Sequence, residues 1–256
     1  MRIAGRVLKL TGFIIGSIIG SFLGVCIHRI PRGESPVAPR SHCPKCGAQL
    51  GAAELIPIIG YVFIWGRCRH CRERVSVLYP ILEVGCGLLS ARVLGAEGFT
   101  LSAVNSLILI SLAVVAAGID FQHRIIPDIV TLPWMAVGLV IAAFSGGIQG
   151  VFSRALGIVG CGGLVFLIAI ISRGGMGGGD VKFMALIGSF LGVPGGLTSF
   201  VIACVIGAIV GVILIVSGIK SRKDEIPFGP FISLGTIMVC VFGERLIPMV
   251  FPWLRF

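Results

Sequence analysis

Charged residues are scarce in this 256-residue chain: only 12% are Asp, Glu, Lys or Arg, about half the share of a soluble globular domain. Hydrophobic residues make up 56%, and the mean hydropathy is +1.04. A soluble shell around one core needs more charge than this, so an ordinary soluble enzyme is disfavoured. The same composition excludes a disordered chain, a coiled coil and a small disulfide-stapled domain. Because these classes are excluded or disfavoured, we expect a polytopic membrane protein.

Strict two-residue alternation of apolar and polar positions is also lacking, so a membrane β-barrel is not expected. The apolar residues instead form runs, most of them close to the length of about 20 residues that a helix needs to cross a bilayer. The eight predicted spans are Leu10–Ile27, Val77–Leu94, Leu101–Gly118, Ile126–Phe144, Val151–Ile171, Phe183–Val193, Leu197–Ile219 and Phe231–Phe251. The sixth is short and fits either a half-span or a tilted helix that starts near Gly179. We therefore expect an all-α polytopic membrane protein with about eight transmembrane helices.

Acidic residues are few as well, 11 against 21 Lys and Arg, and the net charge is +10. In a soluble protein this balance would suggest nucleic acid, but in a membrane protein basic loops face the cytoplasm and anionic lipid, so no nucleic-acid partner is expected. Placing the loop Arg29–Arg74 inside puts 14 of the 21 basic residues on the cytoplasmic side. Both chain ends then face outward, although Arg2, Arg6 and Lys9 oppose this orientation. No small-x-small cleavage site follows the first apolar run, so we expect that helix to stay uncleaved.

One long segment, residues 28–76, has a soluble composition and contains two C-x-x-C pairs. The four cysteines are Cys43, Cys46, Cys68 and Cys71. Each C-x-x-C turn places two thiolates on one side of a tight knuckle, and two knuckles close a tetrahedral cage around zinc. Disulfides and free thiols are the alternatives, and a reducing cytoplasm disfavours the disulfides. With four Cys ligands no position remains open for water, so the predicted zinc is structural.

Carboxylates at membrane depth are costly and therefore mark candidate functional sites. Asp120 ends the third predicted span, Asp128 follows Pro127, and Asp180 follows a glycine-rich stretch that includes Gly177 and Gly179. In the eight-span model Asp120 and Asp180 reach the same membrane face. Two close carboxylates cannot both ionise, so one acts as a base toward water while the other polarises a scissile carbonyl, as in an aspartic protease.

Each of these acids also has a purely structural interpretation. Asp180 sits where it can cap a helix N-terminus. Asp120 can be a solvated residue at the interface, and for Asp128 capping and polar support compete evenly with catalysis. The glycines beside Asp180 permit unusual backbone angles and the close approach of an extended peptide. Phosphate binding by this stretch is disfavoured because it lacks a P-loop or dinucleotide-binding pattern.

Several motifs together resemble one known family. The G-x-G-D sequence at Gly177–Asp180, preceded by IDFQHRIIPD, resembles the type IV prepilin peptidases, which are membrane aspartic proteases of the GxGD kind. The resemblance covers nearly the whole chain. The further matching stretches are GSFLGVCIHRIPR at 20–32, SHCPKCG, GRCRHC, VLYPILE at 77–83, DIVTLPW at 128–134 and IPFGPFISLG at 226–235.

This resemblance implies that Asp120 and Asp180 are the catalytic pair, with Asp128, Gly177 and Gly179 supporting them. It implies a bacterial inner-membrane enzyme that cuts the basic leader from prepilins or pseudopilins at the cytoplasmic face. Many members then methylate the new N-terminal residue with S-adenosylmethionine, and the four-cysteine domain accompanies that activity. Gly66, before the second cysteine pair, matches a position linked to methylation.

The implied organisation is a first transmembrane helix at 1–27, a cytoplasmic zinc domain at 28–76 and a transmembrane peptidase domain at 77–256. Membrane lipid and the apolar helix of the substrate are the expected partners. Two other functions remain open. A transporter or channel would use the intramembrane carboxylates as ion sites, although the acids lie at one interface and no inverted repeat is visible. A membrane-anchored zinc scaffold would leave Asp120 and Asp180 without a role.

Overall fold

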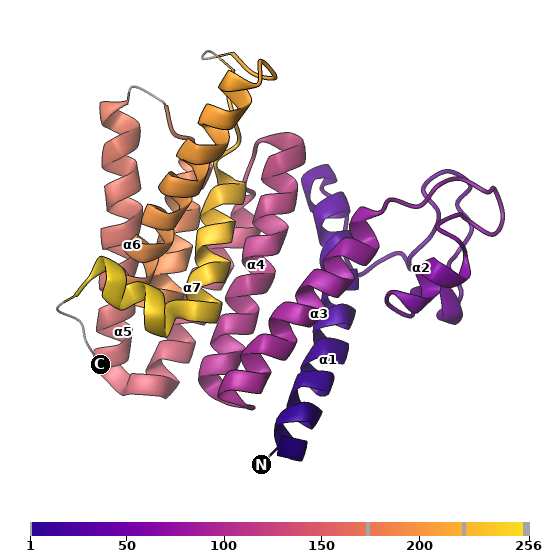
Figure 1. Cartoon of the computed structure of the whole chain (residues 1–256), viewed down its shortest axis with the longest axis horizontal. Helices are drawn as coiled ribbons and strands as arrows, with labels where there is room; N and C mark the ends of the chain where they lie inside the picture. The colour runs from indigo at the N-terminus through magenta and orange to yellow at the C-terminus, as the bar shows by residue number, and fades with distance from the viewer. Residues whose placement is uncertain (1, 173–174, 222–223, 253–256) are drawn as a thin grey trace. The chain divides into compact units, whose positions relative to one another are not determined.

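The computed structural model describes residues 2–172, 175–221 and 224–252, and within them the protein is all-helical, as predicted (Figure 1). Two isolated β-bridges, between His42 and Gln49 and between Arg67 and Arg74, are the extended pairings in this described part. Residues 173–174 and 222–223, which hold three of the basic residues counted on the cytoplasmic side and one glycine of the stretch before Asp180, lie outside the described residues.

The chain divides into two compact units, Met1–Ala103 and Val104–Phe256. The elements that begin in the first unit are α1 (Arg2–Arg29), the 3-10 helices η1 (Ile30–Arg32) and η2 (Ala52–Leu55), α2 (Ile59–Phe63), α3 (Leu78–Glu97) and the first residues of α4 (Leu101–His123). The second unit holds the rest of α4 together with α5 (Asp128–Ile171), α6 (Gly178–Val216) and α7 (Gly229–Val250). All four cysteines of the predicted zinc site belong to the first unit, and all three candidate acids belong to the second.

Small residues bring α1 and α3 together in the first unit. Gly12, Gly16 and Gly20 recur every four residues and so share one face of α1. A Cβ at any of them would lie 2.3–2.8 Å from a backbone oxygen of α3, so only glycine permits this approach. Close backbone packing through small residues is the usual means of helix association in a bilayer, where no hydrophobic force drives it.

Within the residues that the structure describes, six helices are long and apolar enough to cross a membrane, so the prediction of eight separate spans is not confirmed. The difference arises because α5, with 44 residues, covers the fourth and fifth predicted spans, and α6, with 39 residues, covers the sixth and seventh. A straight helix of the α5 length would measure about 66 Å, twice the hydrocarbon thickness of a bilayer. Neither helix is straight.

Glycines break both long helices. Gly146 (φ −143°) and Gly147 (φ 56°) are non-helical in α5, and Gly192 (φ 68°) is non-helical in α6. The chain folds back after each break: the two halves of α5 run in opposite directions in Figure 1, and a Cβ on Gly196 would lie 3.6 Å from a Cα in the first half of α6. The short sixth predicted span therefore corresponds to residues 178–191, the first half of α6.

Candidate active site and metal centre

Asp120 lies in the last turn of α4 and is buried, with 7% of its surface exposed. Its Oδ2 accepts a hydrogen bond of 2.9 Å from the backbone N–H of Gly229, the first residue of α7. N–H groups in the first turn of a helix have no partner within that helix and carry partial positive charge. The N-terminus of α7 therefore holds the Asp120 carboxylate from outside its own helix.

Gly229 is a site residue that the sequence analysis missed. A Cβ at this position would lie 2.7 Å from Oδ2 of Asp120, so any larger residue displaces the carboxylate. The IPFGPFISLG motif was noted, but the glycine received no role. The sequence signal for Gly229 was its position between Phe228 and Pro230, at the start of an apolar helix. Glycine does not stabilise a helix, so its presence there needs another reason.

Asp180 is the third residue of α6 and is half-buried. Its Oδ2 accepts a hydrogen bond of 3.3 Å from the Gly177 N–H, and its own N–H donates to the Gly177 carbonyl at 3.1 Å. The capping contact considered from the sequence is therefore present. It leaves the rest of the carboxylate available, and Asp180 lies close enough to Asp120 for the two carboxylates to interact electrostatically.

The two supporting glycines act by different means from those expected. Neither Gly177 nor Gly179 has a positive φ, so unusual backbone angles do not explain them. Gly179 instead permits a close approach, because its Cβ would lie 3.2 Å from the Cβ of Ile126 in the segment between α4 and α5. This contact joins the start of α6 to the segment that follows Asp120.

Asp128 is the first residue of α5, is exposed, and accepts a hydrogen bond of 2.7 Å from the Lys182 ammonium of α6. A second exposed ion pair, Arg124 with Glu225 at 3.6 Å, connects the end of α4 to the segment before α7. Exposed pairs of this kind contribute about 0–1 kcal/mol each. Asp128 thus joins the start of α5 to α6 through an exposed ion pair.

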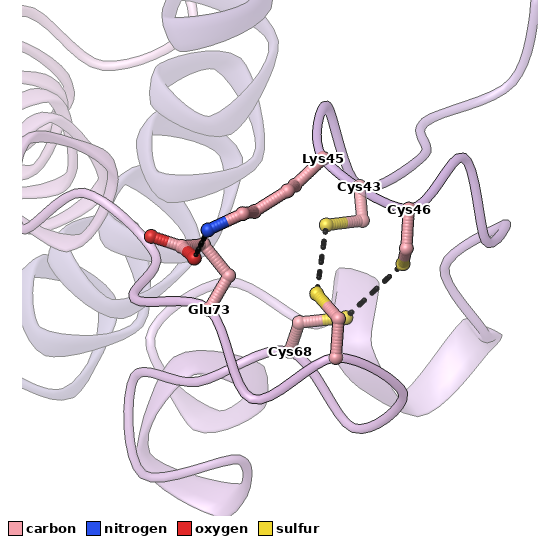
Figure 2. A network of polar contacts seen from close by, with 6 residues as sticks. Cys43, Lys45, Cys46, Cys68 and Glu73 are labelled. Carbon is pink, nitrogen blue, oxygen red and sulfur yellow. Dashed lines mark hydrogen bonds and ion pairs between the residues drawn. The ribbon is translucent and has the colours of Figure 1, made fainter.

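The four predicted zinc ligands lie together in the first unit, with all four sulfur atoms within 4.8 Å of one another. Figure 2 shows the sulfurs of the two turns facing each other, with Cys43 3.7 Å from Cys71 and Cys46 3.9 Å from Cys68. A tetrahedral site with Zn–S bonds of about 2.3 Å has sulfur–sulfur separations of about 3.8 Å. The cluster could therefore hold a metal ion, and two of its sulfur–sulfur distances match those of a tetrahedral zinc site.

The two C-x-x-C turns have the same backbone structure. In each, the first cysteine donates its N–H to the carbonyl five residues later, from Cys43 to Ala48 at 2.9 Å and from Cys68 to Glu73 at 2.8 Å. The residue after each second cysteine is left-handed, with φ 71° at Gly47 and φ 60° at the equivalent position 72. The ligands are therefore presented by a repeated local fold.

Backbone donors, more than basic side chains, favour the thiolate form of Cys43 and Cys68, while burial and the other thiols of the cluster raise the pKa of Cys71. The N–H groups of Cys46 and Lys45 lower the pKa of Cys43 to about 7, and equivalent N–H groups from the second turn lower the pKa of Cys68. The Lys45 ammonium forms an ion pair with Glu73 of the other turn (Figure 2), which raises the pKa of Lys45 and lowers that of Glu73.

A buried glutamate fastens the four-cysteine segment to α3. Glu83, in the VLYPILE motif, is buried, and its Oε2 accepts a hydrogen bond of 2.7 Å from the Ile58 N–H before α2. Ile58 has φ 65°, which is unfavourable for a β-branched residue. Gly66 also has a positive φ, and a Cβ there would lie 2.7 Å from the hydroxyl of Tyr61. Both contacts constrain the segment between the two cysteine pairs.

Two family models match the chain, one for each compact unit. Residues 14–95 match the bacterial peptidase A24 N-terminal domain, and residues 107–212 match the type IV leader peptidase family. No solved structure matches.

Curated relatives match over most of their length. A prepilin leader peptidase/N-methyltransferase of Bacillus subtilis (strain 168) is 35% identical over 92% of this chain and 94% of the relative. Proteins with the same name from Burkholderia pseudomallei (strain 1026b) and Pseudomonas putida are 33% and 29% identical, over 90% and 91% of this chain and 84% and 90% of their own lengths. The chain belongs to the type IV leader peptidase family.

Proposed function

We propose that this protein removes the basic leader from prepilin-like substrates through a water molecule activated by Asp120 and Asp180. The observation that carries the proposal is that the end of α4 and the start of α6 meet, because Gly179, beside Asp180, packs against Ile126 in the segment that follows Asp120. Family membership and the names of the relatives support the substrate class. Together they favour peptidase chemistry over an ion-transport role for the acids.

The proposed mechanism divides the work between the two carboxylates. One is ionised and takes a proton from the attacking water, and the other is protonated and donates a hydrogen bond to the scissile carbonyl. Each lies at the N-terminus of a helix, Asp180 on α6 and Asp120 against α7. Those helix ends stabilise the ionised carboxylate, whereas the repulsion between two close negative charges keeps the other carboxyl protonated.

The test is leader removal from a purified prepilin by the detergent-solubilised chain. Asp120→Asn and Asp180→Asn should each abolish cleavage, because asparagine keeps the shape but neither shares the proton nor serves as the base. Glu244→Gln is the matched control, since Glu244 is an exposed acid in α7. Undiminished cleavage by either aspartate variant would refute the proposed pair.

A second activity, methylation of the new N-terminal residue with S-adenosylmethionine, is proposed from the names of the relatives. We assign the four-cysteine cluster as a structural zinc site, because four cysteines leave no open coordination position. Since the cluster and the aspartates lie in different units, the two activities should be separable. Chelation of the metal should impair methyl transfer from labelled S-adenosylmethionine and leave leader removal intact.

The proposed location is the bacterial inner membrane, with the zinc site and the aspartate pair at the cytoplasmic face. The distribution of basic residues supports this orientation, because short loops rich in Lys and Arg stay inside. The substrate fits the same geometry: its leader is basic and its helix is apolar, so the bond to be cut lies where water meets lipid. A reporter fused after Arg40 should read cytoplasmic, and an external reading would overturn the orientation.

A further inference from the structure

A cavity of about 370 Å³ lies in the second unit at the helix ends opposite the aspartate pair. The helices α5, α6 and α7 begin beside the acids, and the cavity is lined by the breaks inside α5 and α6 and by the last turn of α7. The lining residues are Ala142, Ser145, Gly146, Gly150, Ser153, Arg154, Leu191, Gly192, Pro194, Gly195 and Ile247. It plays no part in the proposed peptidase chemistry.

The cavity exists because the first half of α6 is short. Residues 178–191 span about 21 Å as a helix, whereas residues 128–145 of α5 span about 27 Å. The α6 chain therefore turns at Gly192 before it reaches the level of the α5 turn at Gly146 and Gly147. The recess between the two turns therefore lies about 21–27 Å along the helices from the aspartate end, toward the opposite side of a hydrocarbon layer about 30 Å thick.

An unpaired arginine occupies this recess. Arg154 is half-buried, and its Nη1 lies 3.7 Å from the position that a Cβ on Gly192 would take. Among residues 2–172, 175–221 and 224–252 no hydrogen bond or ion pair to the Arg154 guanidinium is found. An arginine within a membrane helix is costly unless an anion or water meets it, so the charge is a mark of function. Its five donors match the oxygens of a phosphate.

Other groups in the recess favour the same ligand. The hydroxyl of Ser153, beside Arg154, is also without a described partner and is close to Gly192. The breaks at Gly147 and Gly192 each start a new half-helix, and the positive ends of half-helices attract anionic groups within membranes. The Ser153 hydroxyl and the half-helix ends thus reinforce the anion site that Arg154 and the cavity define.

The surroundings distinguish a lipid from a free ion. Phe144 is 80% exposed and Ile148 is 87% exposed, and both flank the α5 turn that lines the cavity. Large apolar side chains this exposed on a membrane protein face acyl chains. The geometry points to a binding site for the phosphodiester headgroup of an anionic phospholipid, with the phosphate on Arg154 and Ser153 and the acyl chains against Phe144 and Ile148.

The test uses the full chain in nonionic detergent, titrated with dioleoyl phosphatidylglycerol, dioleoylglycerol or inorganic phosphate while the melting temperature is followed. Phosphatidylglycerol should raise the melting temperature, and the other two should not. Arg154→Gln should raise the half-saturating lipid fraction about tenfold, the loss expected for a charge-assisted hydrogen bond. Arg245→Gln, which removes an exposed arginine of α7, should change it less than twofold.

A second variant keeps the arginine and fills the space. Gly146 lines the cavity, has a negative φ and has open space at its Cβ, so Gly146→Leu should fold and yet weaken the lipid about tenfold. Unchanged binding in both variants would overturn the site. If dioleoylglycerol raised the melting temperature equally, the site would not recognise a phosphate. If inorganic phosphate raised it equally, the ligand would be a free anion and not a lipid. Loss in Arg154→Gln but not in Gly146→Leu would place the lipid outside the cavity.

Discussion

Gly229→Ala is the sharpest perturbation of the proposed active site, because it adds one methyl group directly against Asp120, a member of the proposed catalytic pair. The new Cβ would lie 2.7 Å from Oδ2 and 3.0 Å from Cγ of Asp120. The carboxylate must retreat by about 0.7 Å to reach ordinary contact near 3.4 Å. That movement stretches the 2.9 Å hydrogen bond from the Gly229 N–H beyond a useful length.

The expected loss follows from two independent magnitudes. A hydrogen bond to a charged group contributes about 1.5–3 kcal/mol, which corresponds to about 10- to 150-fold in rate. Misplacement of a catalytic group by about 1 Å costs about 100-fold. We therefore expect leader removal by Gly229→Ala to fall about 100-fold, mainly in kcat, because Asp120 is mispositioned while the substrate still binds.

The assay is a time course of leader removal at several prepilin concentrations, so that kcat and KM are measured separately. Gly243→Ala is the matched control: it is the same change in the same helix, and its Cβ would meet its neighbours at an ordinary 3.7 Å. A melting curve of each variant tests for global unfolding. Wild-type kcat for a folded Gly229→Ala protein would refute the role of this contact.

Three further predictions follow from the same geometry. In the cysteine turns, Gly47→Ala should destabilise the metal-bound segment by about 1 kcal/mol and Arg72→Gly should stabilise it by a similar amount, because both positions are left-handed. Metal retention against a chelator measures both effects. If both variants changed metal retention in the same direction, the prediction would be wrong. Asp128→Asn and Lys182→Gln should each lower stability by less than about 1 kcal/mol and keep cleavage within about threefold of wild type, since the pair is exposed; an inactive Asp128→Asn protein would instead put Asp128 in the chemistry. The purified chain should contain about one zinc ion by elemental analysis, lost in Cys43→Ser, and metal-free wild-type protein would remove the assignment.

Several features were predictable because they depend on local chemistry. The clustering of the four cysteines followed from C-x-x-C spacing, since each pair needs only one turn to present both sulfurs. Asp120 and Asp180 stood out because a carboxylate beside an apolar run is expensive wherever the chain takes it. The eight apolar segments were located, but their joining into six helices was not, because glycine is common in membrane helices and its sequence position does not reveal whether it breaks one.

What the sequence by itself determined is the class of the molecule: its composition requires a membrane, its cysteines specify a metal cage, and its acids mark candidate sites. Tertiary structure decided which distant groups meet. The Asp120–Gly229 hydrogen bond joins residues 109 positions apart, and Lys182 pairs with Asp128 rather than with Asp180. The turn at Gly192 leaves Arg154 facing a cavity. Such contacts depend on how whole helices end and pack, which no local pattern encodes.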